Sequence, residues 1–307
     1  MILYLLLLFI GSVLLYYGAD LVVKGGIHIA EEFRVSHLVI GLTVVAFGTS
    51  LPELVVSLNA AISDANTIAI GNIIGSNIAN VGLVLGISSL LFPVTIQLQE
   101  IKRDLLYYVI VSFVFVLMIM NGIISRLEGV FLFGGIIGYT IMMIRRPPAE
   151  VTEREDHFTS MKAAAVALVG GVILLWCGAE VFVYGAIRIA RILGVSEIVI
   201  GMSIVALGTS LPEFATSFVA ALKKQSAISI GNIVGSNLFN VLSVLGITAM
   251  VAPLASPRHI LFLEIPYMLV YGIILFPIAF MKQPVPRWVS LLLFAGYIIF
   301  LSQLFYS

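Results

Sequence analysis

Apolar residues along this chain gather into long stretches that are separated by short polar connections. A helix needs about 20 apolar residues to cross the hydrocarbon core of a membrane. Stretches of suitable length lie near residues 2–23, 36–62, 67–92, 104–121, 128–144, 163–184, 195–222, 227–252, 260–280 and 288–305. The pattern therefore predicts an all-α polytopic membrane protein with ten transmembrane helices.

The composition changes this picture little, because it also indicates a membrane protein. Of the 307 residues, 61% are hydrophobic and 10% are charged, whereas a soluble domain carries about 25% charged residues. The 16 basic and 16 acidic residues balance, so nothing indicates a nucleic acid partner. The expected partner is the lipid bilayer, and no obligatory protein partner is evident.

Positive charge is distributed unequally between the two faces that ten spans would create. The loops after the first, third, fifth, seventh and ninth spans hold 12 of the 16 Lys and Arg residues, and the other loops hold 4. Cytoplasmic loops of membrane proteins carry the excess of Lys and Arg. The sequence therefore predicts a multi-pass protein of the cell membrane with both termini outside and residues 145–162 in the cytoplasm.

The chain matches itself without a gap at a shift of 160 residues. Gly48–Glu53 (GTSLPE) is identical to Gly208–Glu213, and Gly71–Asn77 (GNIIGSN) matches Gly231–Asn237 (GNIVGSN). Because each copy holds five predicted spans, an odd number, the second copy is expected upside down relative to the first. Inverted repeats of this kind are typical of secondary transporters, with the substrate site near the midplane.

The duplication predicts three parts of the chain. A first five-helix repeat occupies residues 1–144, and a second, inverted repeat occupies residues 163–307. Between them, residues 145–162 form a polar linker with a Pro pair and charges of both signs. At 18 residues, this linker is too short to fold as a regulatory domain.

Two glutamates lie at matched positions inside predicted spans. A carboxylate at the bilayer centre costs about 3 kcal/mol on insertion scales, so it is normally retained for a function. Glu53 and Glu213 would meet near the pseudo-two-fold axis, and no Lys or Arg falls in the same spans. Such a pair requires either a bound cation or shared protons.

A proline precedes each of these glutamates and is expected to disturb the helix. Pro52 and Pro212 remove a backbone donor and clash with the preceding turn, which frees carbonyl groups about one turn upstream. These carbonyls would line a cavity as oxygen ligands, because irregular backbone at this depth is tolerated only there or inside protein. The carbonyls concerned belong to Ala46, Phe47, Thr49, Ala206, Leu207 and Thr209.

The GNIxGSN segments add amide and hydroxyl oxygens on one stripe of a helix. The residues at positions i, i+4 and i+8 are Asn72, Ser76 and Asn80, with the partners Asn232, Ser236 and Asn240. Oxygen ligands of these kinds suit Ca²⁺ and Na⁺. No His or Cys cluster offers a site for a softer metal, no cofactor is expected, and neither H-E-x-x-H nor G-x-S-x-G indicates an enzyme.

The two G-T-S-L-P-E segments, each followed by G-N-I-x-G-S-N, resemble those of the prokaryotic sodium/calcium exchanger family over nearly the whole chain. The resemblance implies a calcium site made by the carboxylates of Glu53 and Glu213 with the carbonyls of Thr49 and Thr209. Asn80 and Asn240 would complete its centre. Sodium sites would draw on Ala46, Ser50 and Ser76 in one half, and on Ala206, Ser210 and Ser236 in the other.

The resemblance also implies a mechanism, and either Na⁺ or H⁺ is considered as the coupling ion. Na⁺ and Ca²⁺ would compete for overlapping oxygens during alternating access, while the first and sixth spans move as a unit. Some members of the family carry Asp where this chain has Asn240, so this site has one charge fewer. The main prediction is sodium/calcium antiport, and the alternative is proton/calcium antiport at the same glutamates. A passive channel is disfavoured, because paired carboxylates bind too tightly for fast conduction.

Overall fold

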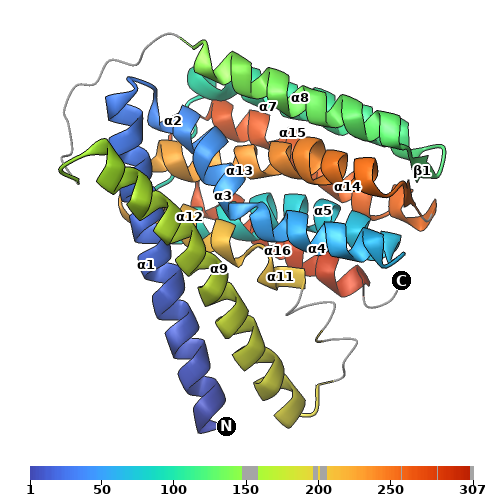
Figure 1. Ribbon diagram of the computed structural model, residues 1–307, viewed down its shortest axis with the longest axis horizontal. Helices are drawn as coiled ribbons and strands as arrows, with labels where there is room; N and C mark the ends of the chain where they lie inside the picture. Colours follow the sequence, from blue (N-terminus) through green and yellow to red (C-terminus); the bar gives the residue numbers. More distant parts are fainter. Residues whose placement is uncertain (147–157, 196–199, 201–205, 257, 282, 305–307) are drawn as a thin grey trace.

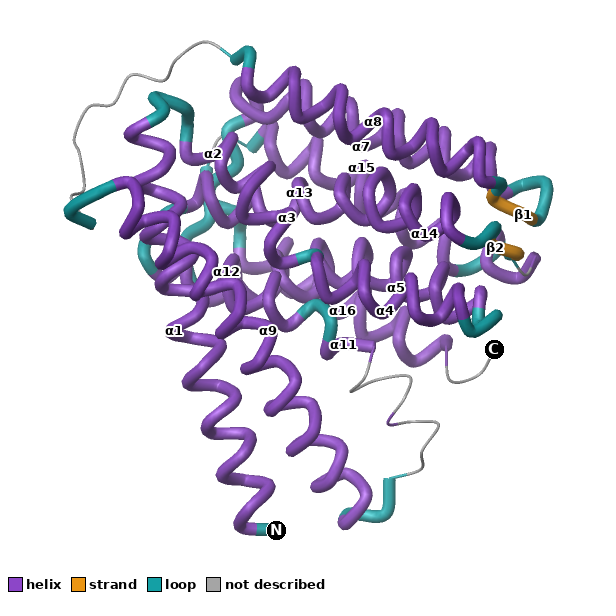
Figure 2. The backbone as a smooth tube through the Cα atoms, in the orientation of Figure 1, coloured by secondary structure: helices purple, strands orange, loops and turns teal. Residues whose placement is uncertain are grey.

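The protein, in a computed structural model, is a bundle of helices with one two-stranded sheet (Figures 1 and 2). The structure describes residues 1–146, 158–195, 200, 206–256, 258–281 and 283–304. Strands β1 (Ile123–Ile124) and β2 (Leu254–Ala255) pair antiparallel at one end of the bundle. This small sheet joins one repeat to the other, and an isolated antiparallel bridge between Thr95 and Pro284 joins the positions that correspond to the two strands under the 160-residue shift.

Two long helices, α1 (Ile2–Glu32) and α9 (Met161–Ile192), lie side by side and project from the bundle (Figure 1). They run antiparallel and are equivalent under the 160-residue shift. Glycines at seven-residue spacing form their contact: Gly11, Gly18 and Gly25 on α1, and Gly171, Gly178 and Gly185 on α9. A Cβ atom at Gly18 would lie 2.9 Å from the carbonyl oxygen of Gly171, so the two backbones touch.

Both long helices extend beyond the predicted spans, which ended at residues 23 and 184. As a result, Asp20 lies within α1 rather than near its end. Its carboxylate forms an ion pair with Lys24 at 2.8 Å and another with Lys223, the residue that follows helix α12 (Leu211–Leu222) of the bundle. The equivalent acidic residue of α9, Glu180, is exposed.

Helix α9 also contacts the bundle at two glycines. A Cβ atom at Gly48 would lie 2.7 Å from the Cγ2 methyl of Val172, and one at Gly208 would lie 2.6 Å from the Cγ2 methyl of Val183. Each glycine therefore leaves room for a valine of α9.

A broken helix begins the inner part of each repeat. In the first repeat it comprises α2 (His37–Ile40), the π-helical turn η1 (Gly41–Val45), α3 (Ala46–Thr49) and α4 (Leu51–Ile62). The axis bends by 43° at Ser50. In the second repeat, α11 (Ala206–Gly208) and α12 (Leu211–Leu222) repeat the break. Residues 196–199 and 201–205 lie outside the described residues, so the predicted span 195–222 is described only in part.

A second inner helix follows in each repeat and is continuous, as predicted. The first comprises α5 (Asn66–Ala79), η2 (Asn80–Leu85) and α6 (Gly86–Leu91). The second comprises α13 (Ser226–Phe239), η4 (Asn240–Val244) and α14 (Leu245–Val251). The turns η2 and η4 are π-helical, a geometry often found at functional sites, and they begin at Asn80 and Asn240.

The remaining helices pack around the inner ones. They are α7 (Leu98–Ile119), α8 (Arg126–Ile144), the 3₁₀ turn η5 (Arg258–Leu261), α15 (Glu264–Phe280) and α16 (Arg287–Leu304). Helix α8 lies at the top of the view and α16 below the inner helices (Figure 1). Glu128 serves the start of α8, where it forms a capping box with Ser125.

The polar linker was interpreted as a solvated segment, and Arg146 at its start departs from that expectation. Residues 147–157 of the linker lie outside the described residues. The guanidinium of Arg146 binds both carboxylate oxygens of the fully buried Asp104, at 2.5 and 2.7 Å. The hydroxyl of Tyr139 also donates to Asp104, at 2.9 Å. The buried carboxylate holds the arginine, since an unpaired charge there would be costly.

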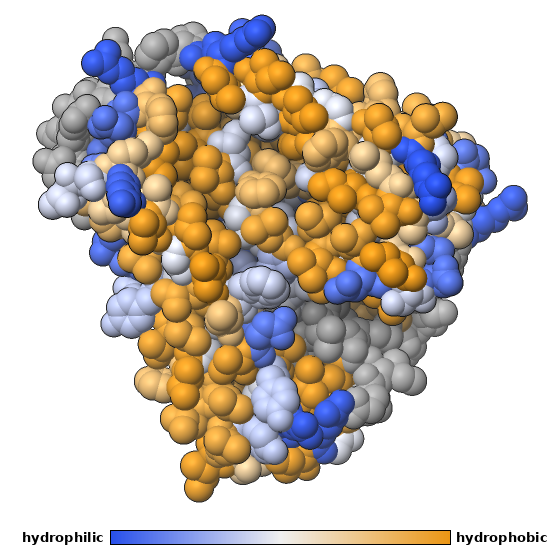
Figure 3. All heavy atoms as spheres, viewed as in Figure 1, coloured by the Kyte–Doolittle hydropathy of each residue, from blue (hydrophilic) through white to orange (hydrophobic). Residues whose placement is uncertain are grey.

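Six helices of the described residues are long and apolar enough to cross a membrane, and the bent pair His37–Thr49 with Leu51–Ile62 makes a seventh. Two further apolar helices, α12 and α15, are shorter. Hydrophobic residues cover much of the visible surface, and hydrophilic ones lie mostly near its ends (Figure 3). The protein is therefore a multi-pass membrane protein, while the count of ten spans stays a prediction.

Candidate functional site

The two predicted glutamates occupy equivalent places at the broken helices. Glu53 is in the first turn of α4 and Glu213 in the first turn of α12, each directly after a proline in that turn. Proline suits a first turn because its missing N–H would have no partner there. Both glutamates are fully buried, at a helix end whose dipole favours negative charge.

The hydroxyl and amide groups around Glu213 come from both repeats. Ser50 Oγ donates to Glu213 Oε1 at 2.9 Å, and Ser236 Oγ lies 3.5 Å from the same oxygen. Thr49 Oγ1 is 3.1 Å from Asn232 Oδ1 and 3.4 Å from Ser236 Oγ. We call Thr49, Ser50, Asn232 and Ser236 the Glu213 flank.

The equivalent groups surround Glu53, with one difference. Ser76 Oγ lies 3.5 Å from Glu53 Oε1, and Thr209 Oγ1 donates to Asn72 Oδ1 at 3.2 Å. Ser210 Oγ bonds Ser76 Oγ at 3.3 Å, whereas its counterpart on the other flank bonds the carboxylate directly. We call Asn72, Ser76, Thr209 and Ser210 the Glu53 flank.

Nine buried side-chain oxygens have no hydrogen-bond partner among the described residues, and four of them belong to the two glutamates and the central asparagines. These four are Glu53 Oε2, Glu213 Oε2, Asn80 Oδ1 and Asn240 Oδ1, two from each repeat. Each unpartnered buried group costs about 1–3 kcal/mol, and more when it is charged. The described residues form no ion pair with either carboxylate. These four oxygens, two of which belong to fully buried carboxylates, are therefore suited to a cationic ligand.

Two of the six asparagine and serine residues on the predicted ligand stripe have another role. The amide of Asn72 donates to the carbonyl oxygen of Glu53 at 3.2 Å and to Ser57 Oγ at 2.9 Å. Asn232 makes the same contacts with Glu213 and Ser217, at 3.3 and 2.9 Å. These amides fasten the first turn of each glutamate helix to its neighbour.

The expectation about freed carbonyls is wrong in part. The Ala46 carbonyl accepts the N–H of Ser50 at 3.0 Å and the hydroxyl of Thr49 at 3.3 Å, because the α-helical bond survives up to the break. In the second repeat, the N–H of Ser210 is 3.1 Å from the Leu207 carbonyl, one residue later than in the first repeat. Ala206 begins α11, and the conformation of its side chain lies outside the described set.

Of the four residues behind the central asparagines, sequence reasoning missed Tyr108 and Met268, and it did not foresee what Asn77 and Asn237 bond. Asn80 Nδ2 donates to Asn237 Oδ1 at 3.0 Å, and Asn240 Nδ2 donates to Asn77 Oδ1 at 3.1 Å. The amides of Asn237 and Asn77 in turn reach Tyr108 and Met268 on the outer helices α7 and α15. One signal was present: Tyr108 and Met268 are themselves 160 residues apart.

The arrangement suits a hard cation bound by oxygen. Two carboxylates, two amide oxygens and nearby hydroxyls are ligands that Ca²⁺ and Na⁺ accept. Within the described residues, no group of three or more His, Cys, Asp or Glu side chains is placed to hold a metal. The chemistry available is reversible cation binding rather than bond making or breaking.

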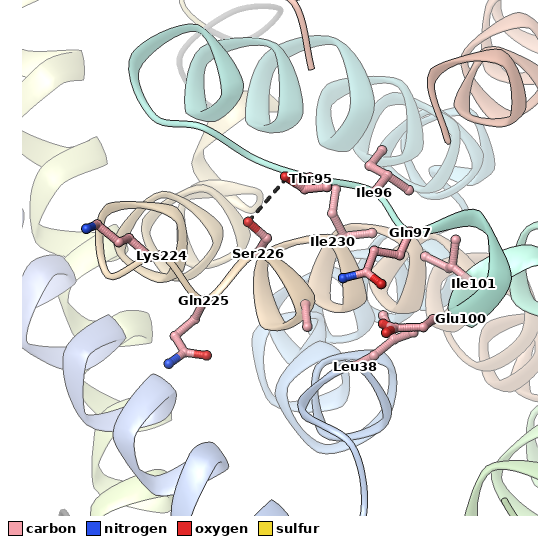
Figure 4. Close-up of a pocket in the computed structure, with 11 residues that line it drawn as sticks. Leu38, Thr95, Ile96, Gln97, Glu100, Ile101, Lys224, Gln225, Ser226 and Ile230 are labelled. Atoms are coloured by element: carbon pink, nitrogen blue, oxygen red, sulfur yellow. Dashed lines mark hydrogen bonds between the residues drawn. The ribbon is translucent and has the colours of Figure 1, made fainter. Parts of the chain in front are cut away.

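A separate pocket of about 350 Å³ lies at the surface, where the loop before α7 meets the start of α13 (Figure 4). Thr95 N donates to Ser226 Oγ at 3.3 Å across it, and Gln97, Glu100 and Lys224 also line it. No residue of either flank lines this pocket. It is therefore distinct from the buried glutamate pair.

A family model described as "Sodium/calcium exchanger protein" matches the chain twice, over residues 3–145 and 163–306. The chain is 33% identical to the sodium/calcium exchanger MaX1 of Methanosarcina acetivorans, covering 98% of each protein. It is 38% identical to the putative antiporter CaxA of Alkalimonas amylolytica, covering 80% of this chain and 79% of that protein.

A solved structure has the same fold. The sodium-calcium exchanger NCX_Mj, soaked with Na⁺ and Sr²⁺, is similar with a TM-score of 0.85 and 35% identity, over 97% of both chains. These relatives are secondary transporters rather than enzymes. The paired motifs, the polytopic helical fold and the matches along both halves agree, and the chain belongs to the sodium/calcium exchanger family of membrane antiporters.

Proposed function

We propose that the protein exchanges Na⁺ for Ca²⁺ across the cell membrane by alternating access at the paired glutamates. The observation that carries this proposal is the set of four unpartnered buried oxygens, Glu53 Oε2, Glu213 Oε2, Asn80 Oδ1 and Asn240 Oδ1. All four belong to the inner helices, and two come from each repeat. A divalent cation bound among them would satisfy every one and neutralise both carboxylates.

The calcium site, in this proposal, comprises these four oxygens and the backbone carbonyls of Thr49 and Thr209. Ca²⁺ takes six to eight oxygen ligands in flexible geometry, so carboxylates, amides and carbonyls suffice without a soft ligand. With both glutamates ionised, one Ca²⁺ leaves the site neutral. No resident cofactor is needed, because Ca²⁺ and Na⁺ are the transported substrates.

The sodium sites, in this proposal, lie at the two flanks. Ser50 and Ser236 both lie within 3.5 Å of Glu213 Oε1, and Ser76 lies at 3.5 Å from Glu53 Oε1 and contacts Ser210. The carbonyls of Ala46 and Ala206 would complete these sites, and that of Ala46 has a lone pair to offer when the Thr49 hydroxyl donates to Asn232 Oδ1 instead. Because Na⁺ would share the glutamates with Ca²⁺, one ion has to leave before the other loads.

The membrane arrangement belongs to the same proposal. Residues 1–144 and 163–307 would form inverted five-helix repeats, with the linker 145–162 in the cytoplasm and both termini outside. The antiparallel packing of α1 against α9 supports the inversion, since equivalent helices of inverted copies run in opposite directions. The glycine contact between them also supports movement of this pair as one body.

Proton/calcium antiport is the second candidate, and one observation favours it. Two fully buried carboxylates without a basic partner among the described residues are stable when they share protons, and Asn240 contributes no third charge. The ring of six Ser and Thr hydroxyls favours sodium instead, because protons need no such ligands.

Uptake of ⁴⁵Ca²⁺ into proteoliposomes loaded with Na⁺, with K⁺ or with acid tests the proposal. We expect uptake only with an outward Na⁺ gradient. Glu53→Gln and Glu213→Gln should each abolish it, because each removes one of the two charges that bind Ca²⁺. Glu180→Gln is the matched control, since that glutamate is exposed on α9, and it should transport normally.

Two outcomes would reject the proposal. Uptake that follows the pH gradient and ignores Na⁺ would establish proton coupling at the same glutamates. Sodium-driven uptake that survives both glutamine variants would place the site elsewhere in the molecule.

A further inference from the structure

The amide groups of the two central asparagines are each held by a second asparagine of the opposite repeat. Asn80 donates to Asn237 Oδ1 at 3.0 Å, and Asn237 Nδ2 donates to the Tyr108 hydroxyl at 3.3 Å. We call this chain of contacts the Tyr108 relay. Asn80, Asn237 and Tyr108 are all fully buried, so water does not compete with its hydrogen bonds.

The second chain of contacts has the same order. Asn240 donates to Asn77 Oδ1 at 3.1 Å, and Asn77 Nδ2 lies 3.7 Å from the Met268 sulfur. We call this the Met268 relay. Both relays cross between the repeats, begin at a central asparagine and end on an outer helix, α7 or α15.

The direction of each relay decides which atom faces the glutamates. An amide has one acceptor end and one donor end. When the outer residue accepts from the second asparagine, that asparagine turns its oxygen inward and accepts from the central one. The central asparagine then donates its NH₂ group in this hydrogen bond, which leaves its oxygen available to a cation. In both relays the free atom is the oxygen Oδ1.

A reversed amide would have the opposite effect on a cation. The NH₂ group of Asn80 or Asn240 would point its hydrogens at the glutamates and at any Ca²⁺ bound between them. Such a donor repels a cation and competes with it for the carboxylates. The orientation of these two amides therefore contributes to cation selectivity. In each relay it depends on the outer residue, which acts through the second asparagine.

We propose that Tyr108 and Met268 are positioning residues of the cation site, which act through Asn237 and Asn77 to keep the oxygens of Asn80 and Asn240 toward the glutamates. The inference rests on the proposed function, because it concerns the affinity of that same site. Neither Tyr108 nor Met268 touches the glutamates or either flank through any side-chain hydrogen bond described for this structure.

The two relays differ in strength. The phenol oxygen of Tyr108 is a good acceptor, whereas a thioether sulfur is a weak one. Tyr108 should therefore contribute more to amide orientation than Met268. A net hydrogen bond is worth about 0.5–1.5 kcal/mol, which corresponds to a change in affinity of about 2-fold to 13-fold.

Equilibrium Ca²⁺ binding to the purified full-length protein, measured by calorimetry, tests the inference with Tyr108→Phe. We expect Ca²⁺ affinity to fall about 5-fold to 10-fold. Met268→Leu should reduce it by about 2-fold, because a weaker contact is lost. Tyr271→Phe is the matched control, since it removes a buried hydroxyl that bonds the Leu293 carbonyl outside both relays, and it should bind normally.

A double-mutant cycle separates positioning from general packing. If Tyr108 acts through Asn80, then Tyr108→Phe should have no further effect on Ca²⁺ affinity in an Asn80→Ala background. Loss of packing alone would weaken binding equally in both backgrounds.

Each outcome decides the inference. Unchanged Ca²⁺ affinity in Tyr108→Phe, an equal loss in Tyr271→Phe, or full additivity with Asn80→Ala would overturn it while leaving the proposed function in place. If the unmodified protein fails to bind Ca²⁺ under the same conditions, the proposed function fails and the inference fails with it.

Discussion

The Glu213 flank and the Glu53 flank are built from the same two motifs, yet they differ in packing. Thr49, Ser50, Asn232 and Ser236 on the Glu213 flank are all at most 3% exposed. On the Glu53 flank, Thr209 and Asn72 are half-buried, and Ser210 bonds a hydroxyl rather than a carboxylate. Equal sequences therefore give unequal accessibility.

The difference continues into the helices behind the flanks. Gly231 and Gly235 of α13 contact the backbone of α2 and η1, where an added Cβ atom would lie 2.7 Å from a carbonyl oxygen at either position. At Gly71 and Gly75 of α5, an added Cβ atom would meet no described heavy atom within 4 Å. The Glu213 side of the site is closed by backbone contact, whereas the described residues supply no such contact at Gly71 and Gly75. The alternating access proposed above would use such an inequality, because a site open equally to both sides would leak.

The largest expected effect concerns this glycine contact. Gly231→Ala should lower the free energy of unfolding by about 1–3 kcal/mol, since its Cβ atom would strike the Leu38 carbonyl and Gly41 Cα, which are both backbone. Gly71→Ala should be neutral or stabilising by up to about 1 kcal/mol, because alanine favours a helix. Unfolding in detergent measures both. Equal losses for the two variants would show that the flanks are packed alike.

A smaller effect is expected at the two serines that begin the glutamate helices. Ser50→Ala should raise the Na⁺ concentration that half-inhibits Ca²⁺ binding by about tenfold, because this hydroxyl bonds the Glu213 carboxylate. Ser210→Ala should raise it by about threefold, since that hydroxyl bonds only Ser76. Na⁺ competition against ⁴⁵Ca²⁺ gives both values. The reverse order would mean that the looser flank binds sodium more strongly.

The smallest effect is expected where the long helix α1 meets the bundle. Asp20→Asn should cost at most about 1 kcal/mol of stability, because the ion pair with Lys223 is partly exposed. This loss should shrink in high salt. Glu180→Gln, the equivalent change on α9, should cost nothing measurable, since that side chain is exposed. Thermal unfolding of both variants at two salt concentrations measures these losses. Equal losses for the two variants would contradict the prediction.

Much of the fold could be predicted from the sequence. The 160-residue shift gave the pairing of Glu53 with Glu213, and the apolar pattern gave the continuous helices at 66–91 and 226–251 within two residues. The lengths of α1 and α9 could not be predicted, because their last turns carry charged residues such as Lys24 that pack beside the bundle instead of ending the helix.

The sequence indicates which residues belong to the candidate site, but not how their side chains are oriented. A helical stripe shows which residues share a face, yet it does not show which neighbour each amide will bond. Asn72 therefore looked like a ligand, although its amide fastens the Glu53 helix. Asn77 belongs to the same motif, but nothing in the sequence shows that it accepts a hydrogen bond from Asn240. The π-helical turns at Asn80 and Asn240 add to this difficulty, since they change the register and follow from no residue preference.

The contact of α9 with the two core glycines has a mechanical consequence. Val172 and Val183 are 11 residues apart, so they stand about 16 Å apart along the helix and occupy the spaces at Gly48 and Gly208 together. Any axial shift of α9 moves both valines out of these spaces at once, toward the larger residues beside Gly48 and Gly208. Helix α9 should therefore favour a few discrete axial positions, in which both valines fit, over the positions between them.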